Sequence, residues 1–143
     1  MNPEEIIESI RSDSAEDADG AQLILEWWRR EGFREPKCTK KDNCIVAELP
    51  LKPIPFTPFA IQRDRKRALY VYLDNIRGTR PFDVDDNWRE FRRRLDRIPG
   101  AHWSETDKGR FSSTKLSDFS NADTRNAFFE LVRWSINEVM AGN

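Results

Sequence analysis

The 143-residue sequence predicts an α+β fold: a small, mostly antiparallel sheet of about four strands, with helices packed mainly on one face. Two observations support this prediction. Segments with helical periodicity stand at both ends of the chain and once in its second half, and strand-like segments follow one another through short turns between them. Short connections favour antiparallel pairing, so the predicted order is α-α-β-β-β-α-β-α, in a single domain over residues 1–143.

The N-terminal region predicts two helices. Asn2 is a good helix cap, and the proline, two glutamates and three isoleucines after it suit a short helix with one apolar face. The stretch SDSAEDADG (12–20) is expected to break this helix, and a second helix is expected to begin at Asp19. Its neighbouring Trp27 and Trp28 point about 100° apart, so one narrow apolar face is not expected to bury both equally.

Charge is distributed unevenly between the start of the chain and the rest. Residues 1–20 contain seven acidic residues and one basic residue, a net charge of −6, whereas the whole chain carries only −1. We therefore distinguish an acidic N-terminal segment (1–18) from an α+β body (19–143). The segment is either an ordinary surface helix or a tail that competes with a polyanion for a basic face of the body.

Residues 44–49, 59–63 and 68–73 are predicted strands in the first half of the body, and residues 33–39 are a candidate for a further short strand before them. The proline-rich stretch 50–58 is expected at a sheet edge or in an extended crossover, because proline donates no ladder hydrogen bond. In the strand 68–73 Leu69, Val71 and Leu73 are expected to face the core, which places Tyr70 and Tyr72 on the opposite face.

The second half predicts two further helices and a strand or irregular hairpin. Residues 84–98 carry an apolar stripe formed by Val84, Trp88, Phe91, Leu95 and Ile98, with arginines on the outer faces. Residues 101–114 are expected to form a strand or a hairpin that turns at 107–109. The closing helix is expected to begin at about Asp123 and to be apolar over a wide arc.

Several motifs together resemble an uncharacterised bacterial domain family. They are GAQLILEWWRREGF (20–33), LYVYLDN (69–75), RPF (80–82), WREFRRRLDRIPG (88–100) and FFELVRWSINEV (128–139). The resemblance covers roughly residues 20–140, and it departs from the family pattern where a KPPF-like turn reads TRPF. These are packing and turn residues, so the resemblance implies a fold and carries over no activity, cofactor or catalytic residue.

The residue types needed for metal binding and nucleophilic catalysis are scarce. Two cysteines, Cys38 and Cys44, and one histidine, His102, are too few for four zinc ligands without carboxylates. His102 is expected to be partly buried beside Trp103, and nothing near Ser104 resembles a strained nucleophile elbow. No glycine-rich phosphate loop is present. The sequence predicts no catalytic residue, no metal and no cofactor.

The location of the protein is predicted from the absence of two signals. The N-terminus has no basic region followed by an apolar run, and no window approaches the ~20 apolar residues of a membrane span. We therefore expect a cytoplasmic protein that does not bind a membrane. The two cysteines are then expected to be thiols, although the short loop between them would also permit a disulfide.

A basic and aromatic surface is the sharpest functional prediction. Basic groups beside aromatic strand residues are what a stacking platform for nucleic acid requires. The candidate contact residues for nucleic acid or a protein partner are Arg63, Arg65, Lys66, Arg67, Tyr70, Tyr72, Arg89, Arg92 and Arg93.

The predicted function is a non-enzymatic accessory or interaction module that contacts nucleic acid or a partner that handles nucleic acid. A purely protein-binding or self-associating domain is the alternative, and an enzyme of unknown class is the third. Against the first reading, the charged turn of an ordinary β-hairpin would explain residues 63–67 equally well.

Overall fold

The computed structural model describes residues 1–39, 41, 44–63 and 67–143. Its elements, in chain order, are α1 (Pro3–Asp13), α2 (Ala15–Arg30), β1 (Lys37–Cys38), β2 (Cys44–Leu49), β3 (Phe56–Gln62), β4 (Ala68–Tyr72), α3 (Leu73–Arg77), α4 (Asp85–Asp96), β5 (Ser104–Thr106), β6 (Phe111–Lys115), the 3₁₀ helix η1 (Leu116–Ser120) and α5 (Ala122–Gly142). The predicted α+β class is confirmed.

The sheet has six strands rather than about four, in the order β1-β2-β3-β4-β6-β5, and every pair is antiparallel. The segment 33–39 contains β1, which has only two residues, and the segment 101–114, expected as a strand or a hairpin, contains β5 with three residues and most of β6. The predicted element order also lacked α3, a five-residue helix that directly follows β4 and has no side-chain cap.

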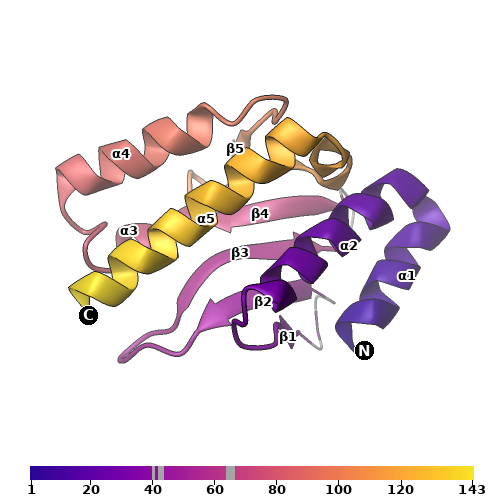
Figure 1. Ribbon diagram of the computed structural model, residues 1–143, viewed down its shortest axis with the longest axis horizontal. Helices are drawn as coiled ribbons and strands as arrows, with labels where there is room; N and C mark the ends of the chain where they lie inside the picture. The colour runs from indigo at the N-terminus through magenta and orange to yellow at the C-terminus, as the bar shows by residue number, and fades with distance from the viewer. Residues whose placement is uncertain (40, 42–43, 64–66) are drawn as a thin grey trace.

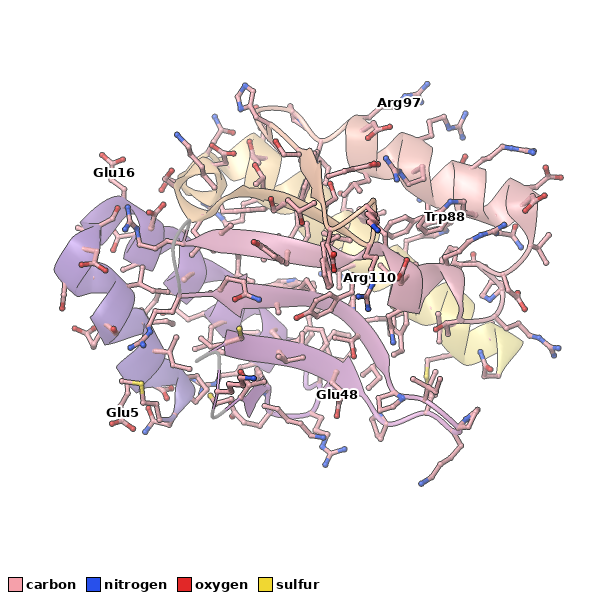
Figure 2. All side chains as sticks on the ribbon, turned by 180° about the vertical axis from the view of Figure 1, so that it is seen from behind. Glu5, Glu16, Glu48, Trp88, Arg97 and Arg110 are labelled. Carbon is pink, nitrogen blue, oxygen red and sulfur yellow. The ribbon has the colours of Figure 1, made fainter. Side chains whose placement is uncertain are left out.

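The helices lie mainly on one side of the sheet, as predicted. In Figure 1, α2 and α5 lie side by side across one face, α1 packs against the outer side of α2, and α4 lies beyond α5. Figure 2 shows the molecule from behind, where no helix of the described residues crosses the sheet. The sheet therefore has one covered face and one open face.

The N-terminal segment belongs to the core. Asn2 and Glu5 form a reciprocal capping box, and Ile6, Ile7 and Ile10 of α1 are at most 2% exposed. Ser14 alone separates the two helices and caps α2, so α2 begins at Ala15 and not at the predicted Asp19. The boundary between residues 18 and 19 falls inside α2, so the acidic segment comprises α1 and the first residues of α2.

Trp27 and Trp28 are buried on two different sides of α2, which agrees with the expectation that one narrow face does not bury both equally. Trp28 reaches the sheet, where its ring lies 5.5 Å from that of Phe59, and its indole N–H donates to the carbonyl of Arg34 at 2.7 Å. Trp27 stacks on Phe129 of α5 with ring centroids 4.2 Å apart. Both tryptophans are consequently buried.

The stripe of α4 is confirmed at Phe91, Leu95 and Ile98, which are buried. Val84 is instead exposed, because it is the N-cap residue and lies before the first turn. Trp88 is half-buried and stacks on Phe91 at 5.6 Å. The helix therefore contacts the core through its second and third turns.

The proline-rich stretch contributes to an interior strand rather than to an edge. β3 begins at Phe56 and contains Pro58, and it pairs with β2 and with β4. The register with β4 begins at Phe59, and the register with β2 shifts at the same end of the strand. Pro58 thus lies where the ladder is interrupted, which makes its missing N–H tolerable.

Candidate functional site

Alternation along β4 separates core residues from surface residues. Leu69 and Val71 point to the covered face and are at most 2% exposed. Tyr70 and Tyr72 point to the other side, as predicted, and both are half-buried. The register then places these residues on the same side, which we call the open face: Val46, Ala60, Ala68, Tyr70, Tyr72, Ser104, Thr106, Phe111, Ser113 and Lys115.

Three aromatic rings gather on the open face. Phe111, the first residue of β6, stands opposite Tyr72 and diagonal to Tyr70. Its ring centroid lies 5.1 Å from that of Tyr72 and 5.9 Å from that of Tyr70. The guanidinium of Arg110 lies 5.6 Å from the centroid of Phe111, and Arg110 pairs with Asp74 at 2.9 Å. The cluster is therefore a compact aromatic patch with a cation at its edge.

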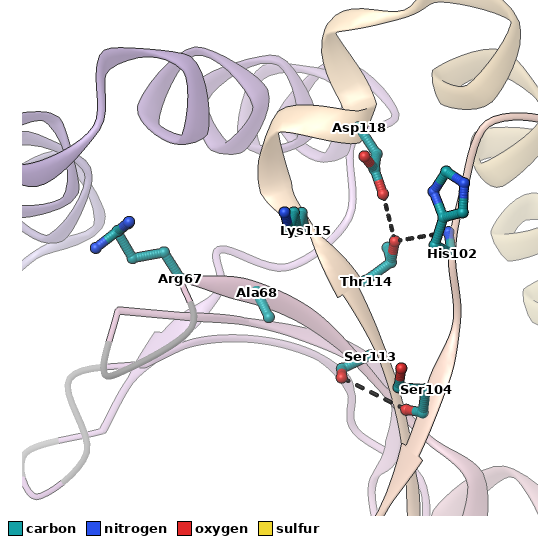
Figure 3. A pocket seen from close by; sticks show the side chains of 8 residues that line it. All are labelled: Arg67, Ala68, His102, Ser104, Ser113, Thr114, Lys115 and Asp118. Carbon is teal, nitrogen blue, oxygen red and sulfur yellow. Dashed lines mark hydrogen bonds between the residues drawn. The ribbon is translucent and has the colours of Figure 1, made fainter.

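A polar hollow of about 780 Å³ adjoins this patch. Figure 3 shows its lining residues, which come from the start of β4 and the residue before it, from β5 and the segment before it, from β6 and from η1: Arg67, Ala68, His102, Ser104, Ser113, Thr114, Lys115 and Asp118. Because Ala68 and Ser113 also flank Tyr70 on the open face, the hollow and the aromatic patch form one continuous surface.

Hydrogen bonds hold the wall of the hollow that η1 forms. The hydroxyl of Thr114 donates to Asp118 at 2.5 Å and accepts from the backbone N–H of His102 at 3.2 Å. Thr114 is buried, so its hydroxyl is used for positioning. The side chain of His102 is exposed, which contradicts the prediction that it is partly buried beside Trp103. The reason is that β5 is an edge strand and His102 precedes it.

Two cations, Arg67 and Lys115, line the hollow, and they differ in how they are held. Arg67 donates from its Nε to Asp17 at 2.9 Å, and the other oxygen of Asp17 accepts from the backbone N–H of Ser117 at 3.0 Å. This buried carboxylate holds the guanidinium of Arg67 against α2. Lys115 is exposed and makes no ion pair with any residue that the structure describes. Among the described residues, Lys115 is thus the cation at the hollow whose ammonium group has no ion-pair partner.

The remaining predicted contact residues lie elsewhere. Arg63 is half-buried and donates to the hydroxyl of Ser9 at 3.0 Å, while Arg65 and Lys66 lie outside the described residues. On α4, Arg92 pairs with Glu105 at 2.6 Å.

Arg89 and Arg93 also belong to α4, and both are paired with acidic residues of the same helix. Arg89 pairs with Asp86 at 2.9 Å and Arg93 with Glu90. The structure therefore brings Arg67, Tyr70 and Tyr72 together, whereas the α4 arginines form a separate surface.

Sequence reasoning missed Phe111, Lys115 and the two serines of the hollow. The alternation in FSSTK would have indicated a strand with Phe111, Ser113 and Lys115 on one side. Nothing local indicates that this strand pairs with β4, because the partner lies about forty residues earlier in the chain. The aromatic patch is a product of that pairing.

Neither of the two cysteines forms a disulfide in the described part of the chain. Burial is the main cause that raises the pKa of the Cys38 thiol above its ordinary value, so the reactive thiolate is disfavoured there. The Cys44 thiol donates to the side-chain carbonyl of Gln62 at 2.8 Å. Both thiols therefore act as packing groups in this arrangement.

Comparison of the chain with family models, with curated proteins and with solved structures gave no match. Among the described residues, no helix is both long enough and apolar enough to cross a membrane.

Proposed function

We propose that the open face of the sheet binds single-stranded nucleic acid, and that the protein is a non-enzymatic interaction module. The observation that carries this proposal is the aromatic patch of Tyr70, Tyr72 and Phe111 beside the hollow that contains Lys115 and Arg67. Aromatic rings on a sheet surface stack on unpaired bases, and nearby cations contact the phosphates.

The geometry favours unpaired bases over a duplex. The three rings belong to neighbouring strands and are half-buried on a surface that no helix of the described residues covers. A ring in this position reaches a base only when the base is unstacked and lies against the sheet. A duplex would present its phosphates to the same surface, without using the rings.

The hollow next to Tyr70 supplies the polar half of the surface. Its serines, Ser104 and Ser113, and the exposed His102 offer donors and acceptors for a base edge or a ribose. Lys115 offers an ammonium group that makes no ion pair with any described residue. A nucleotide stacked on Tyr70 would place its phosphate towards this cation.

The test measures binding of fluorescein-labelled twelve-nucleotide U and dT oligomers by fluorescence anisotropy at several salt concentrations. Tyr70→Leu and Phe111→Leu keep apolar volume but remove the aromatic ring, so each should weaken binding by roughly 1–3 kcal/mol per stacked base. Lys115→Gln should reduce the slope of log K against log salt by about one.

The contribution of the basic residues 65–67 is tested without changing Arg67. Arg67 pairs with the buried Asp17, so changing it would also perturb the fold. We therefore change Arg65 and Lys66 together to Gln and expect a slope reduced by up to about two. Arg89→Gln, on the exposed side of α4, is the matched control and should leave binding unchanged.

Three results would contradict the proposal. One is the absence of measurable affinity for either oligomer near physiological salt, which the protein-binding alternative predicts. Another is an affinity that falls equally in Tyr70→Leu and in the Arg89→Gln control, since this would indicate unspecific attraction. A duplex that competes as well as its single strands would also contradict the stacking mechanism.

A further inference from the structure

A second hollow lies among the helices on the covered side, between α2 and α5. It has a volume of about 400 Å³. Among the residues that line it are Leu23, Trp27 and Arg30 of α2, and Arg125, Phe129 and Arg133 of α5. We call these six residues and the hollow between them the α2–α5 groove. The groove shares no residue with the open face, so its role is independent of the proposed nucleic-acid site.

The two helices run side by side in the same direction. Trp27 stacks on Phe129, and one turn further along both helices Glu31 accepts from Arg133 at 2.6 Å. The lining residues recur every three or four positions on each helix, which is the spacing of one helical face. The groove is therefore about two turns long, or roughly 11 Å at 1.5 Å per residue.

Arginines stand at both ends of the groove and apolar groups lie between them. Arg125 is at the beginning of α5, where it donates to the carbonyls of Phe119 and Ser120. Arg30 and Arg133 are near the other end, and both are exposed. Leu23 and the Trp27–Phe129 stack occupy the middle.

The three arginines have donors to spare. Arg30 makes no ion pair with any described residue, and Arg133 uses its Nε for Glu31. Each guanidinium carries five N–H groups, so these contacts leave most of them unused. Glu130 is the one acidic residue that lines the hollow in the described part of the chain. The groove therefore complements an anionic ligand.

The aromatic pair distinguishes between two kinds of anionic ligand. The rings of Trp27 and Phe129 are stacked on each other with their centroids 4.2 Å apart, and Trp27 is only 4% exposed. A base would find no ring face on which to stack, whereas an aliphatic side chain would find the rim of the pair and Leu23. Trp27 also has a buried indole N–H with no hydrogen-bond partner among the described residues, so this donor is unsatisfied.

We propose that the α2–α5 groove binds an acidic peptide segment of a partner protein. An aliphatic residue of the segment packs on Leu23 and the Trp27–Phe129 rim. Carboxylates before and after it pair with Arg125 at one end and with Arg30 and Arg133 at the other. Arginine forks bind carboxylates in a bidentate manner, which makes the guanidinium spacing a specificity element.

The experiment uses a fluorescein-labelled twelve-residue peptide of Asp and Glu with two central leucines, and the full-length protein. A second peptide replaces every carboxylate by its amide, and a third replaces both leucines by serine. We expect the first peptide to bind at least tenfold more tightly than either of the others, by fluorescence anisotropy at physiological salt.

The protein variants separate the groove from general attraction. The double variant Arg30→Gln/Arg133→Gln should weaken binding of the acidic peptide at least tenfold. The matched control Arg89→Gln/Arg97→Gln removes the same charge from α4 and should leave the affinity within twofold. Unfolding curves of both variants verify that each is folded, and Arg30→Gln alone serves if the double variant is not.

Four outcomes would overturn the proposal. They are equal binding of the acidic and amide peptides, an equal loss in the control variant, displacement of the peptide by the U oligomer, and a dimer in light scattering that the peptide dissociates. The third would assign the groove to nucleic acid and the fourth to a second copy of the chain. None of them affects the proposal for the open face, whose test uses different variants.

Discussion

The two faces of the sheet are made by the same strands, and yet they differ in how tightly their aromatic rings are packed and in how far the rings are exposed to solvent. On the covered face Trp28, Phe59 and Phe128 meet edge to face, and Phe119 packs on Phe128, so that four rings lock two helices and η1 to the strands. On the open face three rings contact one another and remain half-exposed. Alternation within β4 alone separates the two environments.

The degree of burial predicts which substitutions affect stability most. Rings that are fully removed from water contribute most of their transfer free energy to folding. Rings that are half-exposed contribute less, and the remaining apolar surface is available to a ligand. Changes on the covered face should therefore be measured in stability, and changes on the open face in affinity.

The largest expected effect is that of Phe128→Ala. Phe128 is 1% exposed and contacts Phe59, Phe119 and Phe129, so its loss leaves a cavity that the neighbours do not fill. We expect the free energy of unfolding in urea to fall by about 3–5 kcal/mol.

The matched change on the open face is Phe111→Ala. It should cost only about 1–2 kcal/mol, because the ring is half-exposed already. If Phe128→Ala and Phe111→Ala lowered the free energy of unfolding equally, the two faces would not differ in their contribution to stability.

An intermediate effect is expected for Gly20→Ala, at the contact between α2 and η1. A Cβ atom built on Gly20 lies 2.0 Å from the carbonyl oxygen of Leu116, so one of the two backbones must move. Alanine favours a helix by up to ~1 kcal/mol over glycine, but overpacking costs typically 1–3 kcal/mol. We expect a net loss of about 1–2 kcal/mol in the free energy of unfolding.

The control for this contact is Gly142→Ala at the end of α5, where the nearest atom to a new Cβ is a side-chain carbon at 3.3 Å. It should change stability by less than ~0.5 kcal/mol. A stabilised Gly20→Ala protein would mean that η1 yields easily, and that the covered side is less tightly packed than its rings indicate.

The smallest expected effect is that of Glu4→Gln, on the charged rim of the helical layer. A hydrogen bond from Arg29 is the main cause that lowers the pKa of Glu4, and the pair ties α1 to α2 in solvent. Because the folded pKa lies below the unfolded one, this contribution is present above the unfolded pKa and is lost as the pH falls through the folded pKa.

We expect Glu4→Gln to lower stability by at most ~1 kcal/mol at neutral pH, since exposed ion pairs contribute little. The difference from the unchanged protein should shrink in urea unfolding as the pH falls below the ordinary pKa of a glutamate, and vanish once the pH is below the lowered pKa of Glu4. Glu138→Gln, which removes a carboxylate without an ion pair among the described residues, serves as the comparison. If Glu4→Gln lowered the free energy of unfolding by more than about 2 kcal/mol, the exposed ion pair would contribute as much to stability as buried contacts on the covered face, which would contradict this prediction.

Local sequence determined those elements whose signals, such as a helix cap or an alternation of apolar residues, lie within the element itself. Asn2 and Glu5 cap α1 from three residues apart, and the predicted strand 44–49 coincides with β2. The alternation of residues 68–72 placed Tyr70 and Tyr72 away from the core before any partner strand was known. Periodicity is sufficient for these assignments, because an element with one buried face repeats its pattern along its own length.

Tertiary structure alone decided the rest. The pairing of β4 with β6 places Phe111 beside the two tyrosines, and the contact between Asp17 and Arg67 joins residues fifty positions apart. The burial of both Trp27 and Trp28, and the α2–α5 groove with its arginines, depend on where α5 lies. Contacts between distant segments are set by register and by the shape of the packed core, and neither leaves a periodic signal in one segment of the chain.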